Sequence, residues 1–173
     1  MAMRYQKRPP SFAVGEVFAV KHMGWVFFAR VVRHDGDKAH VVSLPEGGFD
    51  EMDFQRKPSA GTRAIISAEE AAQVLSCLGD VHPEVADRKA RFMQLQAALK
   101  SLDPFSKAEA LGMLARRRVE PGLNADEKAL YRQLRNHLQI ELAASLGKTD
   151  QEVDTLLASK GVPDIGWSPS RSS

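Results

Sequence analysis

Two hydrophobic patterns follow one another along the chain. Between residues 12 and 55, short runs of Val, Phe and Ala alternate with turn residues such as Asp35-Gly36, which is typical of strands joined by tight hairpins. From residue 67 onward, apolar residues recur every three or four positions, which is typical of amphipathic helices. This change of period predicts an α+β protein, with a strand-rich first part and an all-α second part.

The first part is expected to form short strands around a small hydrophobic core. The predicted strands cover residues 12–21, 25–33, 38–44 and 49–55. Short strands joined by tight turns favour a small half-open barrel of the SH3 or Tudor type. The aromatic residues expected to fill it are Phe18, Trp25, Phe27 and Phe28.

Helix start signals recur through the second part. Ser67-Ala-Glu-Glu70 and Thr149-Asp-Gln-Glu152 are capping boxes, in which a hydroxyl and a carboxylate satisfy free amide groups of the first turn. Between them, a helix is expected to begin near Pro83, with its apolar residues toward the core and Arg91 pointing away from it.

The most coherent segment runs from residue 103 to residue 147. Asp103 and Pro104 predict the start of a buried helix, which ends in the three arginines 116–118. Asn124 then starts a second helix, whose leucines recur every four residues along one side. Its other side is expected to be cationic, through Lys128, Arg132 and Arg135.

These patterns divide the chain into four parts. Residues 1–11 are expected to form a flexible arm, 12–63 the barrel, 64–160 the helical domain and 161–173 a flexible polar tail. The boundary near residue 63 follows a stretch that carries Pro, Ser and Gly together. Nothing resembles a long coiled-coil seam, so a monomer is expected.

Composition and motifs argue against catalysis. The five histidines are scattered, and neither the metalloprotease nor the Cys-x-x-Cys spacing occurs. The single cysteine, Cys77, excludes an internal disulfide and is expected to be a small core residue. We therefore expect no enzyme activity, no cofactor and no metal centre. No apolar run approaches the ~20 residues that span a bilayer, and the N-terminus is too basic for a secretory signal, so a cytoplasmic protein without membrane contact is expected.

Four features between residues 116 and 147 resemble the C-terminal domain of the bacterial CarD/CdnL transcription regulators. They are the helix end Arg116-Arg117, the turn Gly122-Leu123, the helix start from Asn124 to Lys128, and the helix end from Glu141-Leu142-Ala143 to Gly147. The resemblance covers about half of the chain, from Ala68 to Leu157. It implies a two-domain regulator that binds the RNA polymerase β subunit through the Tudor-like domain and promoter DNA through the helical domain.

The resemblance also implies a set of DNA-binding residues, which would mostly contact the phosphate backbone. A cluster of long cationic side chains attracts DNA phosphates without regard to sequence. Composition alone favours another interpretation, because every helical protein has charged outer faces and arginines suit a helix C-terminus. The candidate residues are Arg88, Lys89, Arg91, Arg116, Arg117, Lys128 and Arg132. Of these, Arg91, Arg116, Arg117 and Lys128 lie at or near positions that match the family.

The sequence departs from the family at the start of the second helix of this domain. The family carries a tryptophan there, which wedges into the minor groove beside the melted region, whereas this chain has Arg88 at about that position. An arginine can bind a phosphate or enter a narrow groove, but it does not unstack bases as an indole does. The departure leaves DNA contact possible and puts promoter opening in doubt.

The barrel resembles the family in part. Val14-Gly15-Glu16 matches its Val-Gly-Asp opening, and Met23-Gly24 lies where the family has a His-Gly step. The strand expected to meet the protein partner is acidic here, although the family carries a basic residue on it. An altered polymerase contact, another partner and an ordinary solvated hairpin all remain open. The residues of this strand are Phe49, Glu51, Met52, Asp53 and Phe54.

Two functions follow from these observations. The first is a non-enzymatic transcription regulator that couples a polymerase contact to a DNA contact, which raises the effective concentration of each. The alternative is a protein–protein adaptor that retains the fold without binding DNA.

Overall fold

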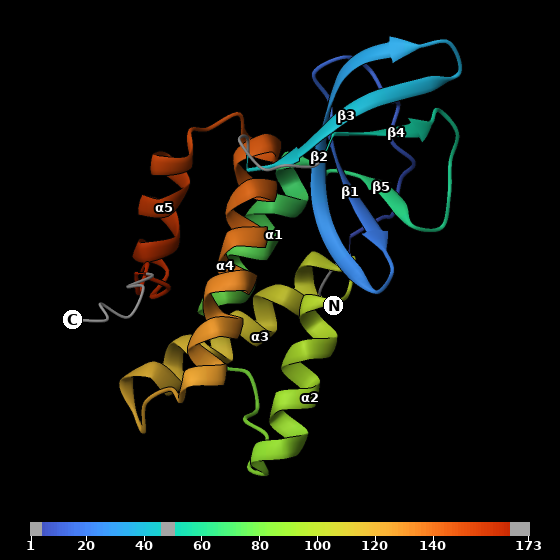
Figure 1. Ribbon diagram of the computed structural model, residues 1–173. Helices are drawn as coiled ribbons and strands as arrows, with labels where there is room; N and C mark the ends of the chain where they lie inside the picture. The colour runs from blue at the N-terminus through green and yellow to red at the C-terminus, as the bar shows by residue number, and fades with distance from the viewer. Residues whose placement is uncertain (1–4, 46–50, 167–173) are drawn as a thin grey trace, which may run out of the picture.

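The computed structural model describes residues 5–45 and 51–166, and it contains five strands followed by five helices (Figure 1). The strands are β1 (Val17–His22), β2 (Trp25–Asp35), β3 (Lys38–Leu44), β4 (Glu51–Gln55) and β5 (Thr62–Ala64). The helices are α1 (Ala68–Gly79), α2 (Arg88–Leu99), α3 (Pro104–Val119), α4 (Ala125–Leu146) and α5 (Asp150–Ser159). The expected α+β class, with a barrel-like first part and a helical second part, is confirmed.

The strands form one antiparallel sheet in the order β4-β3-β2-β1-β5, so β4 and β5 are its two edges. The sequence pattern missed β5, which overlaps the end of the stretch 56–63 interpreted as the domain boundary and pairs with β1. Gly61 permits this pairing, because a Cβ atom there would lie 2.8 Å from the carbonyl oxygen of Lys21. The chain therefore passes into the helical domain from a paired strand and not from a free linker.

The two faces of β2 serve different cores. Phe27 packs in the barrel with Phe18, whereas Phe28 is buried outside that cluster and its ring meets His137 of α4 edge to face at 5.7 Å. Successive side chains of a strand point to opposite faces, which explains why Phe28 does not fill the barrel as expected. Trp25 does not fill it either. It lies at the hairpin end, 60% exposed, with the ammonium of Lys100 5.3 Å from its ring centre.

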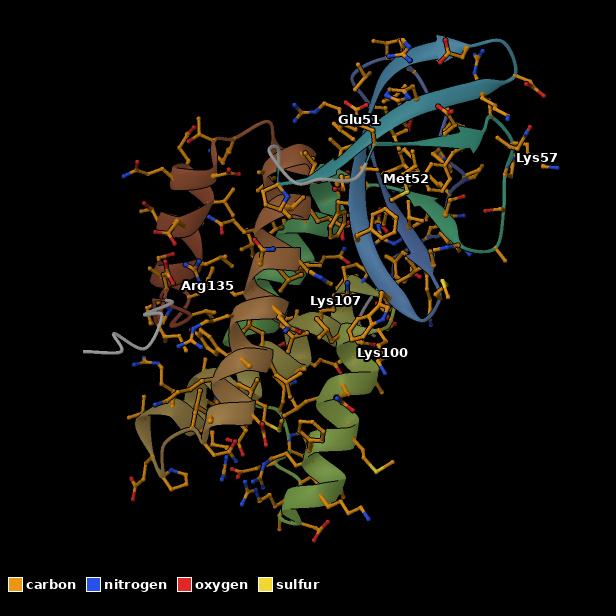
Figure 2. All side chains as sticks on the ribbon, in the orientation of Figure 1. Glu51, Met52, Lys57, Lys100, Lys107 and Arg135 are labelled. Carbon is orange, nitrogen blue, oxygen red and sulfur yellow. The ribbon has the colours of Figure 1, made fainter. Side chains whose placement is uncertain are left out.

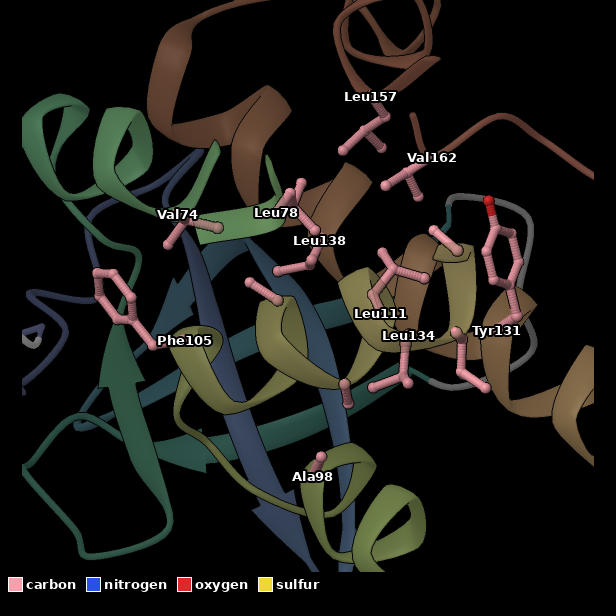
Figure 3. Close-up of a cluster of buried hydrophobic side chains, with 14 of the residues drawn as sticks. Val74, Leu78, Ala98, Phe105, Leu111, Tyr131, Leu134, Leu138, Leu157 and Val162 are labelled. Carbon is pink, nitrogen blue, oxygen red and sulfur yellow. The ribbon is translucent and has the colours of Figure 1, made fainter. Parts of the chain in front are cut away.

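The helical domain is organised around α4 (Figure 3). The capping boxes at Ser67 and Thr149 are present, and Asp103 and Asn124 cap α3 and α4. The helix expected near Pro83 begins only at Arg88. The apolar side of α4 packs against α1, α2, α3 and α5 through buried leucines, which are Leu130, Leu134, Leu138 and Leu142. Among the described helices, none is long and apolar enough to cross a membrane.

One buried ion pair joins the sheet to the helices, and a second polar contact, between α3 and α4, lies against a ring of the sheet. The guanidinium of Arg63, in β5, donates to both carboxylate oxygens of Glu141, in α4. The ammonium of Lys107, in α3, lies 2.8 Å from Nδ1 of His137 and 5.6 Å from the ring centre of Phe28 (Figure 2). Burial lowers the pKa of Lys107 to about 7, and burial together with the Lys107 charge lowers the pKa of His137 to about 3. The barrel and the helices therefore share one polar junction.

Within the described residues, parts of the arm and of the tail contact the helical domain. In the arm, Arg8 forms an ion pair with Glu70 of α1. In the tail, Val162 is completely buried and the hydroxyl of Tyr131 donates to the carbonyl of Pro163 at 2.6 Å. Apolar residues of these segments also contribute, since Tyr5 and Ile165 pack against the helical core.

Candidate nucleic-acid interface

The cations expected to bind DNA come from the ends of three helices. Arg88, Lys89 and Arg91 belong to the first turn of α2, while Arg116 and Arg117 lie in the last turn of α3. Lys128 and Arg132 lie on the first two turns of α4. The structure brings these helix ends together, but it gives their side chains different surroundings.

Arg91 is buried, 4% exposed, and does not point away from the core as expected. Its guanidinium donates to Glu127 of α4 at 3.0 Å and to the carbonyls of Val85 and Ala86. The side chain of Asp87 accepts from the amide of Ala90 and caps the helix, so α2 begins at Arg88 and not near Pro83. The guanidinium is fully engaged within the protein, so Arg91 is a structural residue and is not available to a phosphate.

Arg117 is held in the same network. Its Nε donates to the second oxygen of Glu127 at 2.9 Å, and its Nη1 pairs with Glu84. Although burial favours the neutral acid, hydrogen bonds and charges from Arg117 and Arg91 hold the pKa of Glu127 below its usual range. Glu127 thus satisfies two arginines and also accepts from the side chain of Asn124, the cap of α4. The network ties α2, α3 and α4 together.

Four of the expected cations remain exposed. They are Arg88, Lys89, Arg116 and Lys128. Arg88 and Lys89 border a hollow of about 400 Å³ between the starts of α2 and α4, which also contains the carboxylates of Asp87 and Asp126. The acidic neighbours reduce the positive potential on this side.

A second hollow, of about 380 Å³, is lined by three cationic side chains and by no carboxylate among the described residues. Arg118, Lys128 and Arg132 line it together with Gly122, Leu123 and Ile165. Arg132 is half-buried, and its Nε donates to the carbonyl of Gly166 at 2.7 Å. Arg118 was not among the expected residues, although it belongs to the same run of arginines. We call the set Arg88, Lys89, Arg116, Arg118, Lys128 and Arg132 the cationic end of the helical domain.

Arg135 does not extend this surface along α4, as the helix pattern had indicated. It is buried, and its Nε donates to the carbonyl of Val162 while Nη2 binds the side chain of Asp154 in α5. The label in Figure 2 places it beside α5. Its role is to attach the last helix and the tail to α4.

Among the described strands, the expected partner-binding strand pairs only with β3 and forms one edge of the sheet. In β4, Glu51 and Asp53 are exposed, while Met52 and Phe54 are half-buried against the barrel core (Figure 2). The alternation expected from the sequence is confirmed for these four residues. Phe49 lies outside the described residues.

Comparison with known proteins identifies the family. A family model described as "CarD, C-terminal domain" matches residues 70–158, which is more than half of the chain. This chain belongs to the CarD family. The match agrees with the resemblance expected from Ala68 to Leu157, and it makes the chain a CarD-like, transcription-related protein. A search of curated proteins gives no match.

The structure shows where Arg88, the residue at which the sequence departs from the family, lies in the helical domain. Arg88 is the first residue of α2, and its side chain is exposed beside the Asp87 cap. The start of this helix therefore presents an exposed arginine at the position where the sequence had indicated a departure from the family's tryptophan.

Proposed function

We propose that this CarD-family protein is a non-enzymatic transcription regulator that binds promoter DNA through its cationic end and RNA polymerase through the barrel. The DNA contact is mostly with phosphates, because long cationic side chains at helix ends recognise charge and carry little base information. The observation that carries the proposal is the hollow in which Arg118, Lys128 and Arg132 meet.

The start of α2 limits what this DNA contact can do. Arg88 can bind a phosphate or enter a narrow minor groove, but it has no apolar ring to insert between base pairs. We therefore propose that the protein associates with promoter DNA without wedging it open.

The polymerase contact is proposed for the open edge of β4. An unpaired edge can accept a strand of another protein, because its backbone supplies the hydrogen bonds whatever the side chains. The exposed carboxylates of Glu51 and Asp53 then select a partner strand with basic neighbours. We take the partner to be the β subunit, as the CarD resemblance implies.

A salt titration of binding to a forked promoter fragment tests the DNA contact. Affinity should fall steeply as salt rises, and Arg116→Glu and Lys128→Glu should weaken binding at every salt concentration. Lys148→Glu is a matched control, since Lys148 is an exposed lysine at the opposite end of α4, next to the Gly147 cap. Equal weakening by all three changes would indicate an unspecific charge effect and contradict the proposal.

A protein–protein adaptor without DNA binding is the second candidate. It is favoured by the ion pairs of Arg91 and Arg117, which remove two cations from the expected surface. Under this alternative, the forked fragment binds no better than a neutral control polymer, while the β4 contact survives.

Capture of purified RNA polymerase by the full-length chain tests the barrel contact. Replacing both Glu51 and Asp53 with arginine should abolish capture, because the charge of the strand edge is inverted. Lys57→Glu, an exposed change beyond the end of β4, should leave capture unchanged. Capture that survives the double replacement would remove β4 from the interface.

A further inference from the structure

Three neighbouring strands bring a histidine and two carboxylates together on the outer face of the barrel. Asp35 ends β2, His40 lies in β3 and Asp53 lies in β4, where it is the direct cross-strand partner of His40. One nitrogen of His40 and one oxygen from each aspartate all lie within 4.8 Å of one another. No spacing in the sequence indicates this grouping, because it depends on the register of β2, β3 and β4.

The imidazole of His40 is held in place from both sides. Nδ1 lies 2.9 Å from Oδ1 of Asp53, and Nε2 lies 3.4 Å from Oε2 of Glu51. Only 13% of the His40 side chain is exposed. The ring therefore presents Nδ1 to Asp53, while Glu51 faces the opposite nitrogen.

We propose that this group is a binding site for a divalent transition-metal ion, best suited to Zn²⁺. Nδ1 of His40 and one oxygen each of Asp35 and Asp53 are the protein ligands, and water completes the coordination. Zn²⁺ commonly combines imidazole nitrogen with carboxylate oxygen, and ligand atoms on one ion lie roughly 3 Å apart. The His40–Asp53 separation already has this value, so only the exposed Asp35 has to move closer.

Glu51 supplies a second, independent feature of such sites. A histidine that binds a metal through one nitrogen usually donates its other N–H to a carboxylate, which fixes the ring and its tautomer. Glu51 lies near this position, with its Oε2 3.4 Å from Nε2. The imidazole group adds an affinity for transition metals that a purely oxygen-lined site for Mg²⁺ or Ca²⁺ does not have.

Arg33 is the competing group. It lies on β2 opposite His40, and its Nε is 3.3 Å from Oδ2 of Asp35. Both side chains of this ion pair are about half exposed or more, so the pair is weak and a divalent ion can displace it. A bound ion would connect Asp35, at the end of the β2–β3 hairpin, to Asp53 of β4. It would also offset the negative charge of β4, which we propose as the partner-binding edge.

Isothermal titration of the untagged full-length chain with Zn²⁺ tests the site. We expect one ion per chain at the site. Glu51→Gln should weaken binding by about tenfold, in line with loss of a partner that orients a ligand. His40→Asn and Asp53→Asn, which remove ligands, should weaken it further. Arg33→Gln should tighten binding, because it releases Asp35.

Two controls make the result decisive. His22→Asn removes an exposed histidine from β1 and should leave Zn²⁺ binding unchanged. Cys77→Ser should also leave it unchanged. The Cys77 thiol is 3.9 Å from His82, but burial raises its pKa to about 11 and so disfavours the thiolate that would bind zinc. Unchanged affinity in His40→Asn, or loss of binding in Cys77→Ser, would overturn the proposal.

Co²⁺ provides a test that needs no variant. A cobalt ion bound by one imidazole and carboxylates gives visible ligand-field bands without a thiolate charge-transfer band. The appearance of a thiolate band would place the ion at Cys77 and contradict the site on the barrel, whatever the stability of the His40 variants.

Discussion

Arg63 and Glu141 form a two-bond ion pair in the interior, with Nη2 2.8 Å from Oε1, and both side chains are almost completely excluded from water. Arg63 also donates to the carbonyl of Leu102, and Glu141 accepts from the amide of Ile66. One pair therefore connects β5, the start of the helical domain and α4.

Removing one member of this pair should be costly. We expect Arg63→Met to lower the free energy of unfolding by about 3–5 kcal/mol, because it leaves Glu141 buried without its cation. Urea denaturation at pH 7 measures the loss. Lys148→Met, which removes an exposed ion pair of 4.0 Å with Glu152, four residues along the chain, should cost less than about 0.5 kcal/mol and serves as the control. Equal costs for the two variants would contradict the role of the junction.

Lys107 should make stability depend on pH. Its pKa is about 7 in the folded chain against an ordinary value of 10.5, so between these values the unfolded chain binds the extra proton. The free energy of unfolding should therefore rise with pH from about 7 to about 10, with a slope approaching 1.4 kcal/mol per pH unit. Besides His137, the groups that act on the ammonium are Glu141, Arg63 and Asp103.

The matched variant is Lys107→Met, in which a thioether chain of similar length replaces the ammonium. Urea denaturation at several pH values between 7 and 10 should show a clearly smaller slope for Lys107→Met than for the natural chain. An identical slope in the two proteins would assign the pH dependence to another group.

Arg91 and Arg116 should have separable effects although both were expected to bind DNA. Arg91→Ala should lower the free energy of unfolding by about 3–5 kcal/mol, because it leaves part of Glu127 unpaired in the interior. Arg116→Ala should change stability by less than about 0.5 kcal/mol and reduce the salt dependence of DNA binding by about one phosphate contact. Denaturation and DNA titration of both variants check this division, and a large stability loss in Arg116→Ala would contradict it.

The tail should contribute to stability through Val162. Val162→Ala should cost about 1–2 kcal/mol, because it creates a small cavity in the core between α4 and α5. Val119→Ala removes the same atoms from a side chain that is 76% exposed, so its effect should stay within about 0.5 kcal/mol. Thermal or urea denaturation compares the two, and equal effects would show that the tail does not pack as described.

Local signals were sufficient to predict most of the helices. A cap such as Ser67 and its partner Glu70 lie within one turn, so their hydrogen bonds follow from adjacent sequence. β5 was not predictable in this way, because three residues pair with a distant strand and offer no period of their own. The burial of Arg91, which was expected to point away from the core, could not be predicted locally either. Its carboxylate partner, Glu127, lies 36 positions further along the chain.

In the candidate sites, too, features set by adjacent residues were predictable and features set by distant residues were not. The run of arginines at the end of α3 marked the cationic end, but only the fold decides that Arg117 is held by Glu84 and Glu127 while Arg118 faces the hollow. The grouping of Asp35, His40 and Asp53 could not be predicted from the sequence. Asp53 is 13 residues from His40 along the chain and contacts it only because β3 and β4 pair. Side chains that meet across elements need the tertiary structure to be recognised.

The shared junction has a consequence for exchanging parts between relatives. A barrel taken from another CarD-family member would bring its own residues to the places of Arg63 and Phe28, where they would face Glu141, Lys107 and His137 of the recipient. Such a chimera should fold poorly unless these five positions are transferred as a set. We therefore expect the barrel residues and the helical-domain residues of this junction to be substituted together during evolution.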